Sequence, residues 1–151
     1  MHNSFEKDKV DGKVGVHVVM DAMRKFGLEF VGLNSTSSYD MMMKSELNGK
    51  LYMYEVKTDF QAQKTGNIVV EFESRGNRSG ILVSRADAWA FYLVNQKPKC
   101  HSIIWTISTK KLKSIVVDNE LDIVGGGDDD TSMMWMVPMR DFYREFRIYD
   151  V

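Results

Sequence analysis

The sequence is poor in the residues that build cross-links, because it contains one cysteine, Cys100, among 151 residues. A single cysteine excludes an intrachain disulfide and a cysteine-based zinc cluster. We expect Cys100 to be a small core residue rather than a nucleophile. The sequence also lacks an apolar run long enough to span a bilayer, and residues 1–8 lack the apolar core of a signal peptide. We therefore expect no membrane contact and a cytoplasmic location.

The chain carries little net charge, with 20 Lys and Arg against 21 Asp and Glu, for a formal net charge of -1 at pH 7. A protein that coats nucleic acid non-specifically is strongly basic, so any nucleic-acid site here must be a local patch. The hydrophobic content of 44% and the charged content of 27% are ordinary for a globular protein. The length predicts one domain over residues 1–151, with a core that the eleven methionines help to fill.

The hydrophobic spacing predicts a mixed α/β fold in which helices cover a mixed sheet. Helices are predicted from Lys9 or Gly12 to Phe26, over residues 85–95 and 110–115, and from Pro138 onward. Strands are predicted over residues 28–33, 67–74, 101–107 and 133–137. The helix at 85–95 depends on Ser84 standing three residues before Asp87, which is an N-cap signature, and on an apolar stripe that includes Trp89. Residues 58–66 and the glycine-rich acidic residues 125–130 predict flexible turns.

A hairpin is predicted between Asp40 and Lys57. Its centre is Asn48-Gly49, the preferred pair for a two-residue turn, because both residues tolerate a positive φ. If Leu47 pairs with Lys50, the numbers of opposed residues add to 97, which sets Asp40 directly opposite Lys57. Residues that are opposed, or two apart on one strand, share a face of the sheet.

This register makes Asp40, Glu55 and Lys57 converge on one surface. Opposed Cβ atoms lie about 5 Å apart, so the two carboxylates could reach one divalent cation while the ammonium stays beside them. A turn one residue longer or shorter would move Asp40 to the other face. The alternative is an ordinary solvated strand surface, because Glu-x-Lys is a common pattern on strands.

The order of these elements resembles that of the PD-(D/E)xK nuclease superfamily, and in particular its small phage-type members. Asp40 matches the aspartate of the motif, and residues 55–57, Glu-Val-Lys, match its (D/E)xK. Residues 65–76, 79–81 and 86–89 also look like blocks of those phage-type proteins. The resemblance implies a restriction endonuclease-like αβββαβ core with C-terminal additions, in a bacterium or a phage-infected host cell.

The resemblance further implies a Mg²⁺-dependent DNA endonuclease that acts on branched DNA or on phage or host DNA. Asp40, Glu55 and the carbonyl of Val56 would hold Mg²⁺, for which Mn²⁺ could substitute. The metal would lower the pKa of a water molecule, and Lys57 would position that water or neutralise the transition state. A homodimer would provide two sites for cutting both strands of a duplex or junction.

Basic and acidic residues near this motif have two interpretations each. Four basic residues could contact DNA phosphates or form a solvated basic edge, namely Lys64, Arg75, Arg78 and Arg85. Glu71 or Glu73 could add a metal ligand, although pairing with Arg75 or Arg78 is the simpler interpretation.

The sequence departs from the superfamily pattern at two positions. Tyr39 stands where the motif has proline, and Val16, beside His17, stands where Holliday junction resolvase-like members carry a glutamate on the first helix. Another acid could replace that glutamate, from Glu6, Asp11 or Asp21, or the site could work without one, which makes a second metal doubtful. Val16 and the low net charge favour the alternative function, a catalytically inactive nuclease-fold module that binds nucleic acid or a protein.

Overall fold

The computed structural model describes residues 3–34, 38–127 and 130–151, with the backbone alone for residues 3–6 and 8–10. In chain order the elements are α1 (Asn3–Arg24), β1 (Leu28–Leu33), β2 (Met41–Ser45), β3 (Leu51–Asp59), α2 (Ala62–Thr65), β4 (Asn67–Ser74), β5 (Asn77–Arg78), the 3₁₀ turn η1 (Gly80–Leu82), β6 (Ala88–Leu93), β7 (Ile103–Ser108), α3 (Thr109–Asp118), β8 (Ile123–Gly126), β9 (Ser132–Pro138), α4 (Met139–Phe142), the 3₁₀ turn η3 (Tyr143–Glu145) and β10 (Arg147–Asp150). No helix in these ranges is long and apolar enough to cross a membrane.

The main sheet has six strands in the order β1-β2-β3-β6-β7-β10. Its strands pair antiparallel except β3 and β6, which are parallel. Parallel neighbours need a crossover connection, and here the crossover consists of α2, β4, β5 and η1. β4 and β5 join the later strands β9 and β8 in a second sheet of order β5-β4-β9-β8. The predicted mixed α/β class with a mixed sheet is confirmed.

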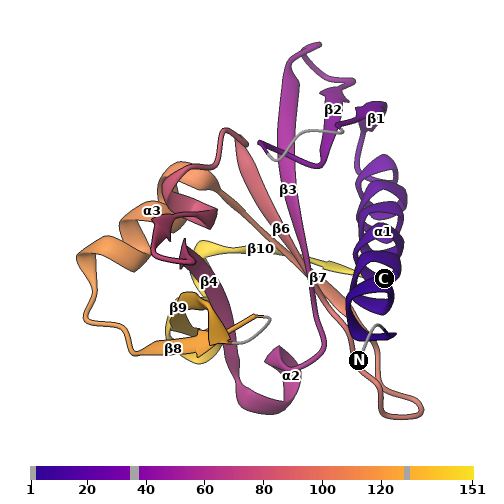
Figure 1. The fold of residues 1–151 in the computed structure, drawn as a ribbon. Coiled ribbons are helices and arrows are strands. Elements are labelled where there is room, and N and C mark those ends of the chain that lie inside the picture. The colour runs from indigo at the N-terminus through magenta and orange to yellow at the C-terminus, as the bar shows by residue number, and fades with distance from the viewer. Residues whose placement is uncertain (1–2, 35–37, 128–129) are drawn as a thin grey trace.

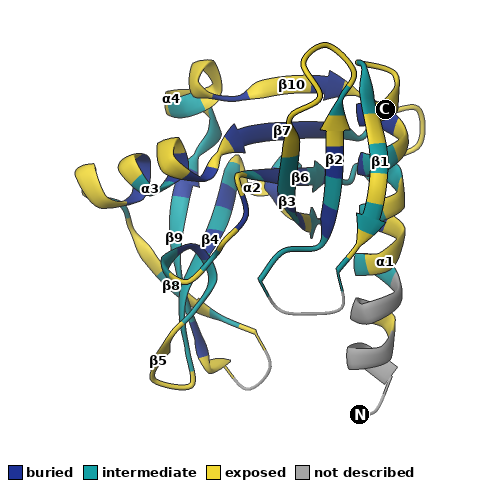
Figure 2. Cartoon of the chain, turned by 90° about the horizontal axis from the view of Figure 1, so that it is seen from above, coloured by how far each residue is buried: buried dark blue, intermediate teal, exposed yellow. Residues whose placement is uncertain are grey.

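The molecule has three layers, with the main sheet in the middle (Figure 1). Helix α1 covers one face of that sheet, and the second sheet and α3 cover the other face. Strand β3 divides its side chains between the two sides, since Tyr54 and Val56 pack in the cluster under α1. Glu55 and Lys57 therefore point to the side of the second sheet. Figure 2 shows that buried residues concentrate in β7, whereas the turn after β4 and the short strand β5 are exposed.

The predicted helix over residues 85–95 is wrong, because this segment forms the central strand β6. Trp89 and Phe91 pack toward the second sheet, whereas Ala90 packs toward α1, and all three are buried. A strand covered on both faces is a continuous apolar run, whose periodicity does not distinguish it from a buried helix. Trp89 is a core residue, as predicted.

Ser84 and Asp87, which resemble a helix N-cap in the sequence, instead form hydrogen bonds at the start of strand β6. The Ser84 hydroxyl oxygen accepts hydrogen bonds from the Ala86 N–H (3.3 Å) and the Trp89 indole N–H (3.2 Å). The Asp87 carboxylate accepts the Met53 N–H at 2.8 Å, and the Asp87 N–H donates to the Met53 carbonyl at 2.8 Å. These bonds tie the start of β6 to β3, so the same residues begin a strand.

The predicted two-residue turn at Asn48-Gly49 is also wrong, because the β2–β3 turn has four residues. The Gly49 N–H donates to the Ser45 carbonyl and the Ser45 N–H to the Lys50 carbonyl, each at 2.8 Å. The numbers of opposed residues then add to 95 instead of 97. A shift of two preserves the alternation of faces, whereas a shift of one would have reversed it. Asn48 accepts the Lys50 N–H with its side chain, and only Gly49 has a positive φ, of 71°.

Most other predicted elements are present with shifted ends. β1 and β4 have the predicted bounds, α1 begins earlier than predicted, and the predicted strands at 101–107 and 133–137 correspond to β7 and β9. α3 begins after Ser108, whose hydroxyl oxygen accepts the Lys111 N–H at 3.2 Å as an N-cap. Pro138 precedes the first residue of α4 by one position. Strands β5, β8 and β10 were not predicted.

Three smaller predictions need correction or remain open. Cys100 is exposed rather than part of the core. Residues 58–66 are ordered, because β3 extends to Asp59, whose carboxylate accepts the N–H groups of Gln61 and Ala62 at the start of α2. Of the predicted acidic turn, residues 125–126 belong to β8, and residues 128–129 lie outside the described part of the chain.

Candidate functional site

Asp40 is held in place at the edge of β3 by three hydrogen bonds. Its N–H donates to the Tyr54 carbonyl at 2.8 Å, and its carbonyl accepts the Asn34 N–H at 2.9 Å. Its carboxylate Oδ2 accepts the Val56 N–H at 2.7 Å. β2 begins only at Met41, so no backbone carbonyl of β2 pairs with the Val56 N–H. The Asp40 carboxylate accepts that N–H instead. The carboxylate is therefore oriented by the hairpin that the sequence predicted.

Glu55 and Lys57 lie two residues apart on β3 and form an ion pair. The Lys57 Nζ is 2.7 Å from the Glu55 Oε1 and 5.5 Å from the centroid of the Trp89 ring. The side chain of Lys57 is 45% exposed and that of Glu55 is 15% exposed. The ammonium group thus lies between a carboxylate and an aromatic ring and remains open to solvent.

The three predicted residues, Asp40, Glu55 and Lys57, line one cavity of about 350 Å³. We call it the carboxylate cavity, and its other lining residues are Glu71, Ser79, Gly80, Val83 and Ser84. They come from β4, β5–η1 and the segment before β6, so the crossover between β3 and β6 closes the cavity over the face of the main sheet. The structure thus brings together residues far apart in the sequence.

Glu71 is a third carboxylate in this cavity. Its Oε1 accepts a hydrogen bond from the Ser79 hydroxyl at 2.6 Å. A Cβ atom at Gly80, which has a φ of 52°, would collide with the Glu71 carbonyl oxygen, so the close approach of η1 to β4 needs glycine. Neither Arg75 nor Arg78 forms an ion pair among the described residues, so the simpler pairing of Glu71 with an arginine is absent.

The electrostatics of the cavity are dominated by negative charge. Burial raises the pKa of Glu55, and the charges of Asp40 and Glu71 raise it further, against the opposing effect of Lys57. A cation beside these carboxylates would relieve their repulsion and favour the ionised form of Glu55. The donor chemistry of the site therefore fits a hard divalent cation.

Two carboxylates and one backbone carbonyl could contact such a cation. The Tyr54 carbonyl and the Val56 N–H both form hydrogen bonds with Asp40. Alternate residues of a strand direct their backbone N–H and carbonyl groups to the same edge of that strand. The Val56 carbonyl therefore faces the edge where Asp40 lies. Within the described residues, no group of three or more His, Cys, Asp or Glu side chains could hold a metal ion. Water or substrate oxygens would have to complete the coordination.

The four predicted phosphate-binding residues do not gather at one place. Arg78 and Arg85 are exposed and adjoin Ser79 and Ser84, which line the carboxylate cavity. The Arg85 N–H donates to the Ser38 carbonyl at 3.4 Å, which ties its loop to the segment before Asp40.

The other two basic residues lie further from the cavity. Arg75 is exposed at the turn between β4 and β5, with a φ of 52°. Lys64, on α2, has its Nζ 3.5 Å from the Gln96 Oε1, in the loop after β6. Lys64 therefore lies beyond the C-terminal end of β3 and does not line the carboxylate cavity.

A second hollow lies on the other side of Asp40. We call it the α1 hollow; it has a volume of about 820 Å³ and is lined by Gly12, Lys13, Val16, His17, Leu33, Asn34, Asp40 and Val56. Val16, where resolvase-like proteins carry an acid, does face the site. Among the described residues, neither Asp11 nor Asp21 lines the hollow, and the side chain of Glu6 lies outside the described part.

No role was assigned from the sequence to Lys13 or His17, which also line this hollow. The signal that could have found them is their spacing, because residues 13, 16 and 17 share one face of a helix.

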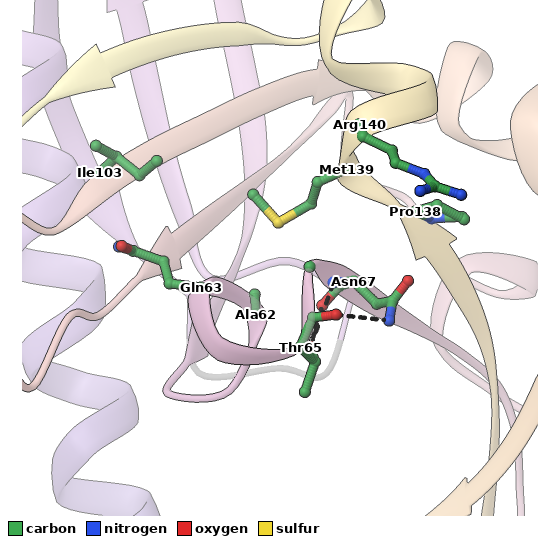
Figure 3. A pocket seen from close by; sticks show the side chains of 9 residues that line it. Ala62, Gln63, Thr65, Asn67, Ile103, Pro138, Met139 and Arg140 are labelled. Carbon is green, nitrogen blue, oxygen red and sulfur yellow. Dashed lines mark hydrogen bonds between the residues drawn. The ribbon is translucent and has the colours of Figure 1, made fainter.

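A separate hollow of about 640 Å³ lies between α2, β4, β7 and α4 (Figure 3). Its polar side chains already have partners, since the Asn67 amide donates to the Thr65 carbonyl at 3.1 Å and the Gln63 amide donates to the Leu93 carbonyl at 2.7 Å. None of the described residues that line it is acidic. It therefore lacks the carboxylates that would bind a hard divalent cation.

Neither a protein-family model nor a curated protein matches the chain. Among solved structures, the chain is similar to one described as a bacterial homing endonuclease, I-Ssp6803I. The match covers 80% of this chain and 80% of that chain, with 22% sequence identity and a TM-score of 0.49. At this level of similarity, the function has to be argued from the side chains of the carboxylate cavity.

Proposed function

We propose that this protein is a metal-dependent DNA endonuclease that hydrolyses phosphodiester bonds at the carboxylate cavity. The observation that carries the proposal is that Asp40, Glu55 and Lys57 line one cavity, where the Val56 N–H orients the Asp40 carboxylate. Asp40 precedes β2 and Glu55 lies on β3, and each is oriented by a hydrogen bond or ion pair of 2.7 Å. Such oriented charges stabilise a transition state without further rearrangement.

Each residue has a distinct role in this proposal. Asp40, Glu55 and the Val56 carbonyl would hold Mg²⁺, or Mn²⁺ in its place, which supplies a Lewis acid for the phosphate and lowers the pKa of a water molecule. Lys57 would position the attacking water or neutralise the charge that develops on the phosphate. The Trp89 ring beneath the ammonium limits where Lys57 can move. Arg78 and Arg85 would contact neighbouring phosphates from the rim.

The proposed activity is tested with Asp40→Asn, Glu55→Gln and Lys57→Ala. Cleavage of linear duplex, single-stranded and four-way-junction DNA is measured with Mg²⁺ and with EDTA. Each variant should lose about 10²-fold or more of the wild-type rate, as expected when a preorganised electrostatic group is removed. Glu73→Gln, on β4 but outside the cavity, is the matched control and should retain activity. Undiminished cleavage in all three variants would overturn the proposal.

Metal binding has its own test, independent of activity. A ligand that binds the folded state raises the free energy of unfolding by about 2.7 kcal/mol at 100 times its Kd. We expect Mg²⁺ to raise the melting temperature of the wild type, and Asp40→Asn and Glu55→Gln to lose this shift. An equal shift in the wild type and both variants would place the ion elsewhere.

The proposal also covers the DNA substrate and the oligomeric state of the protein. Branched DNA, or phage or host duplex, would be cut on both strands most simply by a homodimer. Light scattering of the protein with and without a four-way junction tests this; a monomer bound as one copy per junction argues against it.

One observation supports a second candidate function, a nuclease-fold module that binds nucleic acid or a protein without cutting. Within the described residues, no group of three or more His, Cys, Asp or Glu side chains could hold a metal ion, and Val16 lines the α1 hollow at the helix position where the resemblance expects an acid. A wild-type protein that binds DNA but cuts none of the three substrates with Mg²⁺ or Mn²⁺ would establish this function instead.

A further inference from the structure

We propose that the α1 hollow binds one nucleotide of the substrate strand, next to the phosphate held at Asp40. In this arrangement Val16 and Leu33 contact its sugar or base, and Lys13 and His17 contact its phosphate. This inference rests on the proposed function, because it assigns the path of the DNA strand through that same site.

The α1 hollow and the carboxylate cavity meet at the open edge of β3. Asp40 lines both of them, and Val56 lines the α1 hollow while its N–H bonds to the Asp40 carboxylate. β2 pairs with β3 only as far as Tyr54, so the edge of β3 beyond that residue is not covered by β2. A strand whose phosphate lies at Asp40 can therefore continue from one hollow into the other.

The two hollows differ in charge. The described lining of the carboxylate cavity has Asp40, Glu55 and Glu71 against Lys57. In the α1 hollow Asp40 is the one acidic residue of the described lining, and Lys13 and His17 are both exposed there. A phosphodiester backbone is repelled by unpaired carboxylates and attracted by an ammonium group. The backbone next to the reacting phosphate is therefore favoured on the α1 side.

The shape and polarity of the α1 hollow suit a nucleotide. Its volume of about 820 Å³ falls within the ~300–1,000 Å³ typical of small-ligand sites. Val16 is half-buried and Leu33 is 56% exposed, so they offer an apolar wall. Lys13 and His17 stand four residues apart on α1, on the same face as Val16, so hydrogen-bond donors and an apolar side chain lie together within about one helical turn.

The Asn34 side chain marks the other rim of the α1 hollow. Its amide donates to the Tyr39 carbonyl at 3.1 Å and to the Ser38 hydroxyl at 3.4 Å. These bonds hold the segment that leads to Asp40. The hollow therefore has one wall on a long helix and one on a hydrogen-bonded chain segment, and both walls adjoin the reacting residue.

The first experiment measures binding to a fluorescent DNA duplex by anisotropy, in EDTA, for wild type, Lys13→Ala, His17→Ala and the double variant. We expect the double variant to bind at least 5-fold more weakly, with a shallower salt dependence. Lys97→Ala, which removes an exposed lysine from the loop after β6, is the matched control and should bind as wild type. Wild-type affinity in the double variant, or an equal loss in Lys97→Ala, overturns the proposal.

The second experiment locates the contact on the DNA. A neutral methylphosphonate is placed at each phosphate in turn around the cleaved bond. In the wild type the loss of affinity should peak at one phosphate beside that bond, and in Lys13→Ala/His17→Ala this peak should disappear. An unchanged profile in the double variant overturns the proposal. If the wild type cuts nothing, the proposed nuclease function fails separately, whereas the binding comparison still decides the role of Lys13 and His17.

Discussion

Glu55 illustrates how a single side chain links the electrostatics of the cavity to stability. Burial and the charges of Asp40 and Glu71 raise its pKa above the ordinary value of 4.5. A carboxyl with a raised pKa binds more protons in the folded state than in the unfolded state. The free energy of unfolding therefore falls as the pH rises from 4.5 through the raised pKa.

The substitution Glu55→Gln should remove this pH-dependent decrease in the free energy of unfolding. We expect the variant to gain stability relative to wild type between pH 4 and pH 7, in urea unfolding at each pH. Glu73→Gln is the control and should show a smaller pH-dependent difference. If Glu55→Gln instead lost stability relative to wild type as the pH rose, the ion pair with Lys57 would outweigh the burial and repulsion.

Tyr54, on the opposite face of β3, gives a prediction at alkaline pH. Burial, together with Tyr149 and Tyr52 nearby, raises the pKa of its phenol from 10.0 to about 12. The folded state therefore keeps a proton that the unfolded state loses, and stability should fall by about 2 kcal/mol between pH 10 and pH 12. Tyr54→Phe should show a smaller decline than wild type in denaturant titrations, and Tyr143→Phe, at an exposed site, should not. Equal declines in all three proteins would contradict this.

At the scale of elements, the packing of α1 on β3 depends on the absence of a side chain at Gly15. A Cβ atom there would collide with the Thr58 hydroxyl and lie 3.3 Å from the Thr58 Cβ. Thr58 is β-branched and has little freedom to move away. We expect Gly15→Ala to reduce the free energy of unfolding by about 1–3 kcal/mol, as overpacking does.

Gly12 is the matched control on the same helix, because a Cβ atom there meets nothing within 4 Å. Gly12→Ala should stabilise α1 by about 0.5–1 kcal/mol through helix propensity. Chemical denaturation of both variants measures the difference. A Gly15→Ala protein as stable as Gly12→Ala would show that α1 does not pack closely on β3.

The contact between β4 and η1 needs glycine at position 80 for two reasons, the positive φ and the lack of space for a Cβ atom. Variants at Gly80 and Gly76 separate these two effects. Gly80 and Gly76 both have positive φ, but only at Gly80 would a Cβ atom meet a neighbour, the Glu71 backbone. Gly76→Ala should cost about 1–2 kcal/mol of backbone strain, and Gly80→Ala more than that. Gly80→Ala should also reduce cleavage, since it displaces one wall of the carboxylate cavity. Comparable stability and activity in the two variants would refute the role given to this contact.

The whole molecule, with a formal net charge of -1, has no general attraction for DNA. Binding should therefore depend on the few Lys and Arg side chains at the site, namely Lys13, Arg78 and Arg85. About three phosphate contacts predict a slope of about −3 in a plot of log affinity against log salt. Arg78→Ala and Arg85→Ala should each reduce the slope by about one. A slope that neither variant alters would exclude these arginines from the interface.

The extent to which the fold follows from the sequence differs between elements. β1 and β4 have the predicted bounds because their alternation matches a strand with one buried face. β6 was predicted as a helix because both of its faces are buried, which removes the alternation that identifies a strand. Cys100 was assigned to the core from its residue type, but its loop leaves it exposed.

The sequence by itself determined that Glu55 and Lys57 share one face, because residues two apart on a strand lie on the same side. Asp40 joins them because the turn in the structure shifts the predicted register by two residues, which leaves the alternation of faces unchanged. Only the tertiary structure decided what surrounds them. Glu71 reaches the cavity because the β3–β6 crossover folds into a second sheet, and the α1 hollow exists because β2 stops short along β3. Both features depend on contacts between segments distant in sequence, which no local periodicity records.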